Sequence, residues 1–129
     1  MSHFTTIQTQ VRDLDALSEA CEDLGVELLR GVPCRGYATA RRECARTIRL
    51  KGPYDVAVDP SPGNDGTFAL TTDWWSGHVA SEVGPNFGRL LQAYGVRKTM
   101  REARSRGLRT TRRQEADGSV LLVLEGGAL

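Results

Sequence analysis

Apolar and polar residues alternate in several short stretches of this chain, a pattern typical of half-buried β-strands. The predicted strands are residues 3–11, 26–31, 47–50, 54–58, 67–75, 108–115 and 119–125. The turn-rich segment 60–66 and Asp117-Gly118 each lie between two of these strands and predict hairpins. Residues 120–124 are apolar on both faces, so we expect a central strand that is covered on both sides.

Two other stretches repeat apolar residues at helical spacing. Asp13 can cap the first helix and Gly25 can end it, and its apolar stripe is Leu14, Leu17, Cys21 and Leu24. The second helix is expected to begin at Pro85 or Asn86, after a flexible connection, and to end at Gly107. Its apolar stripe is Phe87, Leu90, Leu91 and Tyr94.

These elements follow the order β-α-β-β-β-β-α-β-β. Because hairpins dominate, we expect an α+β fold: a mainly antiparallel sheet with two helices packed on it. A chain of 129 residues fits one domain, residues 1–129. Residues 37–46 fit a helix, a strand or a loop, and their structure stays open at this point.

Both tryptophans of the chain lie in segment 71–78. If residues 67–75 form a strand, the adjacent Trp74 and Trp75 point to opposite faces. One would then fill the core, while the other would meet a helix, a ligand or a partner. Aromatic and arginine side chains dominate the binding energy of protein interfaces, so the outer tryptophan is a candidate anchor.

Charge is unevenly distributed along the chain, although the formal net charge is only +1. Residues 1–86 carry 8 Lys and Arg against 12 Asp and Glu, and residues 87–129 carry 9 against 4. The second helix would present Arg97, Arg101 and Arg104 beside Tyr94. This face could be a solvated surface, a docking site for an acidic protein or, with weaker support, an RNA-binding face.

Few residues of the sequence suggest a catalytic or cofactor-binding site. Asp73 and His78 could form an acid–base pair, with Glu82 as a third polar group, but no nucleophile motif accompanies them. The simpler interpretation is a capping carboxylate beside a solvated histidine. The chain shows neither a GxGxxG motif nor a P-loop, so ATP hydrolysis and a nucleotide cofactor are not expected.

Cysteine and histidine spacing argues against a metal site. Zinc could be held by His3, His78, Cys34 and Cys44, but zinc ligands usually occur as closely spaced pairs. Cys21 is expected to be buried. Cys34 has the best chance of a lowered pKa because Arg35 follows it, but an inert loop thiol is the favoured interpretation. With three cysteines, no signal-peptide pattern and no long apolar run, we expect a cytoplasmic protein with reduced thiols and no membrane span.

Several segments together resemble a known family. They are residues 1–5, 13–17, 23–25, 73–75, 90–94, 102–104 and 117–119. They are similar to the plastid and cyanobacterial hypothetical chloroplast reading frame thirty-five family, a domain of unknown function. The resemblance implies no established activity. Genes of its members often lie beside those of an AAA-type ATPase and a second small protein, which implies an accessory role. The chain departs from the family pattern at Gly95-Val96 and in the tail 126–129.

We therefore expect a non-enzymatic accessory subunit or adaptor, possessing no cofactor, that contacts other proteins. Its partners would be an AAA-type ATPase and a second small subunit, or another copy of the chain at an open sheet edge. The expected contact residues are Trp74, Trp75, Tyr94, Arg97, Arg101 and Arg104. The alternatives are a small-molecule binding protein or enzyme that uses Asp73, Trp74 and His78, and an RNA-binding module.

Overall fold

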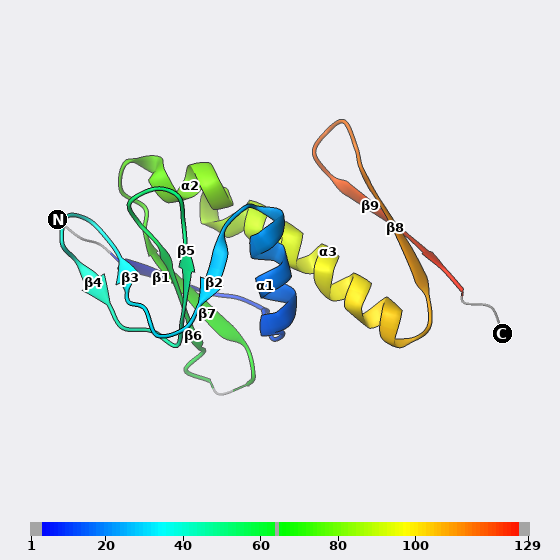
Figure 1. Cartoon of the computed structure of the whole chain (residues 1–129), viewed down its shortest axis with the longest axis horizontal. Helices are drawn as coiled ribbons and strands as arrows, with labels where there is room; N and C mark the ends of the chain where they lie inside the picture. Colours follow the sequence, from blue (N-terminus) through cyan, green and yellow to red (C-terminus); the bar gives the residue numbers. More distant parts are fainter. Residues whose placement is uncertain (1–3, 64, 127–129) are drawn as a thin grey trace.

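The computed structural model describes residues 4–63 and 65–126, and a five-stranded sheet forms its centre (Figure 1). The strands lie in the order β1 (Phe4–Gln8), β7 (Phe68–Asp73), β6 (Val56–Pro60), β5 (Arg46–Arg49) and β2 (Glu27–Leu29). All neighbouring strands within these residues are antiparallel. The predicted α+β class with a mainly antiparallel sheet is confirmed.

The first helix, α1 (Leu14–Asp23), begins and ends as the sequence predicts. Asp13 Oδ1 accepts the backbone N–H groups of Asp15 at 2.9 Å and Ala16 at 3.1 Å. Gly25 takes the left-handed conformation, with φ at 75°, and turns the chain toward β2. The fully buried face of α1 consists of Ala16, Leu17, Ala20 and Cys21.

The long helix α3 (Gly88–Ser105) packs against α1. Its buried residues include Leu90 and Tyr94 of the predicted stripe. The Tyr94 hydroxyl accepts the backbone N–H groups of Arg12 at 3.0 Å and Asp13 at 3.2 Å. This contact fixes the middle of α3 to the first turn of α1.

The segment before α3 is more ordered than the flexible connection that we expected. It contains the turn η1 (Trp75–Gly77), the helix α2 (His78–Val83) and the turn η2 (Pro85–Phe87). Val79, Val83 and Phe87 are fully buried, and these side chains join the core between the sheet and the helices. The sequence pattern does not reveal α2, because six residues are too few for a clear helical period.

Strand boundaries differ from the prediction by one to three residues. β1 ends at Gln8, and the following Thr9 hydroxyl donates to the Phe68 carbonyl at 2.8 Å. β6 begins two residues late, at Val56, and β7 ends at Asp73. The open region 37–46 contains β4 (Arg41–Arg42), which pairs with β3 (Cys34–Arg35) in a small ribbon.

The last two strands form a hairpin that is separate from the five-stranded sheet. β8 (Arg109–Gln114) and β9 (Val120–Glu125) pair through the predicted Asp117-Gly118 turn. In Figure 1 this hairpin, which we call the β8–β9 ribbon, lies beside α3 on the side away from the sheet. The prediction that residues 120–124 form a central strand is wrong: Leu121, Val123 and Leu124 are 40%, 41% and 46% exposed.

Across residues 4–63 and 65–126, none of the helices has the length and apolar character needed to cross a membrane. Asn64 of the predicted turn, His3 and tail residues 127–129 lie outside the described residues.

Candidate interaction site

The two tryptophans occupy different environments just beyond the end of β7. Trp74 packs against the core residue Phe87, with ring centroids 4.8 Å apart. Trp75 is 57% exposed, and its ring meets Tyr37 edge-on at 5.8 Å. One tryptophan therefore points inward and the other outward, as expected. The reason given from the sequence is wrong, because a 3₁₀ turn after β7, rather than strand alternation, separates the two rings.

Asp73 binds the backbone of both members of an aromatic pair, the partly buried Tyr37 and the exposed Trp75. This carboxylate is buried, its Oδ1 accepts the Trp75 N–H at 3.0 Å, and its Oδ2 accepts the Tyr37 N–H at 3.2 Å. Hydrogen bonds from N–H groups to a carboxylate are stronger than those between neutral groups. One side chain thus connects its own segment to the backbone of Tyr37, which lies 36 residues before Asp73.

Backbone conformation also constrains the aromatic pair. Ala38 and Ser76, which follow the two aromatic residues, both take positive φ values, at 55° and 60°. Such conformations cost about 1–2 kcal/mol for residues other than glycine and persist where the surroundings fix them. Gly36 lies against the Phe4 ring, and a Cβ there would stand 2.6 Å from Phe4 Cζ. The aromatic pair is therefore held on a tightly specified backbone.

The predicted acid–base pair has a structural arrangement instead. Asp73 is buried and accepts the backbone N–H groups of Tyr37 and Trp75. His78 is exposed, and its ring meets the Tyr54 ring edge-on, with centroids 5.2 Å apart. Burial raises the pKa of Tyr54, and the negative charge of Asp73 adds to this. Glu82 accepts the backbone N–H groups of Lys51 at 2.8 Å and Gly52 at 2.9 Å. These contacts match the simpler interpretation: structural carboxylates and a solvated histidine.

The arginines of α3 do not form one patch with Tyr94. Tyr94 is buried, so the structure places it inside the fold and not on a contact surface. Arg97 binds both Asp23 oxygens, at 2.8 and 2.6 Å, and Arg101 lies 3.3 Å from Glu19 and 3.4 Å from Asp13. Arg104 is exposed.

Carboxylates of α1 therefore neutralise much of the basic face of α3. Hydrogen bonding from Arg97 is the main reason that the pKa of Asp23 lies below its ordinary value, despite some burial. Burial would raise the pKa of Asp13, but the Ala16 N–H, Arg101 and Lys98 outweigh it and lower that pKa. The uneven charge seen along the sequence is thus partly balanced between these two helices.

Comparison with known families agrees with a domain of unassigned activity. Residues 20–123 match the family described as "Protein of unknown function (DUF1257)", which covers well over half of the chain. The chain belongs to this family. None of the curated proteins and none of the solved structures compared with the chain matches it. The description of the DUF1257 family states no activity.

The sequence pattern gives little sign of a buried ion cluster in this DUF1257 chain. Asp55 is fully buried and contacts Arg35 at 2.8 Å and Arg49 at 3.2 Å. It also accepts the backbone N–H groups of Arg35 and Leu50. Arg35 further donates to the carbonyls of Leu50 and Gly52, which ties the loop after β5 to β3. In the sequence, the only sign of this cluster is a single acidic residue, Asp55, directly before the apolar run 56–58.

The two buried cysteines, Cys21 and Cys34, both have raised pKa values. Cys34 is fully buried, and burial, followed by the charge of Asp55, raises its pKa to about 12, which agrees with the inert thiol that we favoured over a thiolate. Burial also raises the pKa of Cys21 to about 12. Cys44 is partly exposed and lies 2.9 Å from the Thr47 hydroxyl. Within the described residues, no three His, Cys, Asp or Glu side chains gather around a possible metal position.

A groove separates the β8–β9 ribbon from the two long helices. Its volume is about 480 Å³, and its lining includes Leu24, Gln92, Val96, Arg112 and Val120. Gln92 Nε2 donates to the Gly118 carbonyl at 3.2 Å, and Arg112 lies 3.5 Å from Asp23. Asp73 and His78 do not line this groove, so it is distinct from the pocket that the sequence suggested.

Proposed function

We propose that this chain is a non-enzymatic accessory subunit or adaptor whose partner contact is centred on Trp75. The observation that carries the proposal is an exposed indole on a fixed backbone: Asp73 accepts the backbone N–H of Trp75, and the Tyr37 ring contacts the indole edge-on. Large aromatic side chains are the commonest anchors of protein interfaces. An anchor that is ordered before binding loses less conformational freedom when the complex forms.

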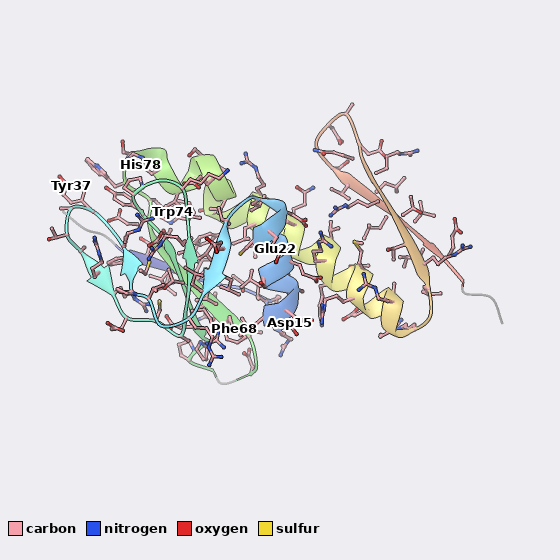
Figure 2. All side chains as sticks on the ribbon, viewed as in Figure 1. Asp15, Glu22, Tyr37, Phe68, Trp74 and His78 are labelled. Atoms are coloured by element: carbon pink, nitrogen blue, oxygen red, sulfur yellow. The ribbon has the colours of Figure 1, made fainter. Side chains whose placement is uncertain are left out.

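The resemblance to the hypothetical chloroplast reading frame thirty-five family supports a choice of partner. Members of that family are encoded beside an AAA-type ATPase and a second small protein, and we propose that one of these is the partner, in the cytoplasm. The chain would supply a docking surface and would need no cofactor of its own. Figure 2 shows Tyr37, Trp74 and His78 together on one end of the five-stranded sheet, at the opposite end of the molecule from the β8–β9 ribbon.

The two alternative functions receive less support from the same contacts. A small-molecule site or an active site would use Asp73, Trp74 and His78, but both Asp73 oxygens already accept backbone N–H groups and Trp74 packs on Phe87. An RNA-binding face would use Arg97, Arg101 and Arg104. The first two of these already pair with carboxylates of α1, which weakens the attraction to phosphate.

Affinity purification of the tagged full chain from its own cells, at two salt concentrations, tests the proposal. We expect an ATPase or a second small subunit in stoichiometric amount with the wild-type chain. Trp75→Ala should weaken its recovery about thirtyfold, as for a typical interface anchor. Trp75→Phe should keep part of the binding, and Arg109→Ala, an exposed residue of the distant ribbon, should keep all of it.

Recovery that is equal for Trp75→Ala and the wild-type chain would contradict the anchor role. A second variant, Asp73→Asn, tests whether the anchor is held in advance. The amide cannot accept both N–H groups, so partner binding should fall, and the near-ultraviolet circular dichroism of the aromatic pair should change. Unchanged binding and spectra with this variant would show that Asp73 does not position the pair.

A further inference from the structure

Strand β9 combines a sequence typical of a covered strand with an uncovered position. Its residues 120–124 are all apolar, which is the pattern of a strand that is buried on both faces. Within the residues that the structure describes, β9 pairs with β8 alone, and its other edge has no strand beside it. Long apolar edges of this kind are templates for pairing with another chain.

Alternate side chains of the ribbon have different surroundings. Val120, Arg112 and Gln114 line the groove toward the helices, and Arg112 reaches Asp23 there. Because side chains alternate along a strand, Leu121 and Val123 face the other way. They lie opposite Arg113 and Thr111 of β8, and both are about two-fifths exposed.

The two open edges of the ribbon differ in charge. β8 contains Arg109, Arg112 and Arg113, whereas β9 contains no charge before Glu125. Two copies of β8 paired around Thr111 would place Arg109 opposite the partner's Arg113, and like charges in opposed positions are destabilising. Charged edges are a common means of preventing such pairing. Only the β9 edge of this ribbon is free of that barrier.

We propose that β9 pairs antiparallel with β9 of a second copy of this chain, around a twofold axis at Leu122. The two ribbons would form one sheet in the order β8-β9-β9-β8. In this register Val120 lies opposite the partner's Leu124, and Leu121 lies opposite the partner's Val123. Every cross-strand pair between residues 120 and 124 is then apolar, and a twofold interface of this kind is the commonest way in which identical chains associate.

A second copy also accounts for the sequence of β9 itself. In the paired sheet β9 becomes one of two inner strands, the position that the run 120–124 predicts. A two-stranded hairpin is only marginally stable alone, and two more strands add the cross-strand contacts that it lacks. The proposal is independent of the Trp75 contact, because Figure 2 shows the neighbouring Trp74 at the other end of the molecule from the ribbon.

Light scattering of the full chain after size-exclusion chromatography, over a dilution series, tests the association. The wild-type chain is expected to have twice the mass of one copy. Val123→Lys should weaken self-association about a hundredfold, because a valine and its symmetry mate are both replaced by cations. Thr111→Lys is the matched control: it adds the same charge on the same face, in register with Val123 but on β8. It should leave the dimer intact.

Engineered disulfides test the register in a Cys44→Ser background, which removes the partly exposed thiol. Opposed residues of antiparallel strands have Cα atoms about 4.5–5.5 Å apart, within reach of a disulfide. Leu122→Cys should therefore form a covalent dimer on mild oxidation, because it meets its own copy. Leu124→Cys should not, because it meets the partner's Val120.

Three results would overturn the proposal: a wild-type chain with the mass of one copy, a Val123→Lys dimer as stable as the wild-type dimer, or cross-linking by Leu124→Cys as efficient as by Leu122→Cys. Capture of a different protein by Leu122→Cys in cells, with no homodimer, would assign the β9 edge to that protein instead. Far-ultraviolet circular dichroism of both lysine variants checks that the ribbon and the sheet stay folded. A dimer lost with Val123→Lys and kept with Thr111→Lys supports the proposal.

Discussion

Apolar strands are buried to different extents in two regions of the molecule. One region is the five-stranded sheet with the helices and loops packed on it, which we call the body, and the other is the β8–β9 ribbon. Val56, Val58 and Leu70 of the body are fully buried, while Leu121 and Val123 of the ribbon are about two-fifths exposed. The body strands have helices over their inner face, whereas the ribbon contacts the side of α3 and is separated from the helices by a groove. The burial of a strand thus depends on the layer above it as much as on its own sequence.

Ion pairs show the same contrast between the two regions. Asp55 of the body is fully buried between two arginines, whereas Arg109 and Glu125 of the ribbon pair across the two strands in solvent. Removing one partner of a buried pair leaves an uncompensated charge inside the protein. Exposed pairs gain little, because water and salt screen them. Substitution of an ion-pair residue should therefore cost more stability in the body than in the ribbon.

The largest effect is expected from Asp55→Ala. This change leaves Arg35 and Arg49 without their shared carboxylate, and we expect a loss of about 3–5 kcal/mol in the free energy of unfolding. Glu125→Gln is the matched change in the ribbon and should cost less than about 0.5 kcal/mol. Urea denaturation measures both values. Similar losses for the two variants would break the contrast between buried and exposed ion pairs.

A pair of leucine truncations should give the next largest difference. Leu70→Ala removes a fully buried side chain of β7 and is expected to cost about 2–5 kcal/mol through lost burial and the cavity that remains. The Leu124 side chain is 46% exposed, so Leu124→Ala should cost less than about 1 kcal/mol in the dissociated monomer. Thermal unfolding at low protein concentration keeps association out of this comparison. A large loss at Leu124 under these conditions would show that the ribbon is packed as tightly as the body.

The smallest effect concerns Asp23, which connects the two regions through Arg97 of α3 and Arg112 of β8. Its pKa lies below the ordinary value of 3.8, so its contribution is complete above that pH and is lost as the pH falls through the lower value of the folded state. Asp23→Asn should cost about 1 kcal/mol at pH 7. The gap between the variant and the wild-type chain should close below about pH 4.

Urea denaturation at several pH values follows this gap. A difference between the two chains that stays constant from pH 7 into the acid range would contradict a role for the Asp23 charge. Increased protease cleavage in the ribbon of Asp23→Asn, compared with the wild-type chain, would assign part of the effect to Arg112. Cleavage that does not change would place the whole effect between the two helices.

Local chemistry made many elements of both regions predictable from the sequence. Asp13 caps α1, Gly25 ends it, and Asp117-Gly118 turns the last hairpin, because each of these residues acts on neighbours a few positions away. The periodic stripe of Leu90 and Tyr94 likewise identified the buried face of α3. Such signals depend on short spacing, and the structure bears them out.

Long-range contacts account for what the sequence did not reveal. The role of Asp73 depends on Tyr37, which is 36 residues away, and Asp55 depends on Arg35, at a distance of 20 residues. The raised pKa of Cys34 follows from burial that no neighbour in the sequence indicates. The environment of residues 120–124 was wrongly predicted because an apolar run shows that a strand needs cover but does not say which chain supplies it.

The hydroxyl of Tyr94 has a consequence for the synthesis of the chain. It completes the start of α1 by accepting the N–H groups of Arg12 and Asp13, yet the ribosome makes it more than 80 residues later. At about 5–20 residues per second, this delay lasts about 4–16 s. During that time α1 lacks its packing against α3, and the nascent chain is expected to bind chaperones that recognise exposed apolar helices. Folding of the body is therefore timed by the arrival of α3, whereas the ribbon can form within microseconds of its own release.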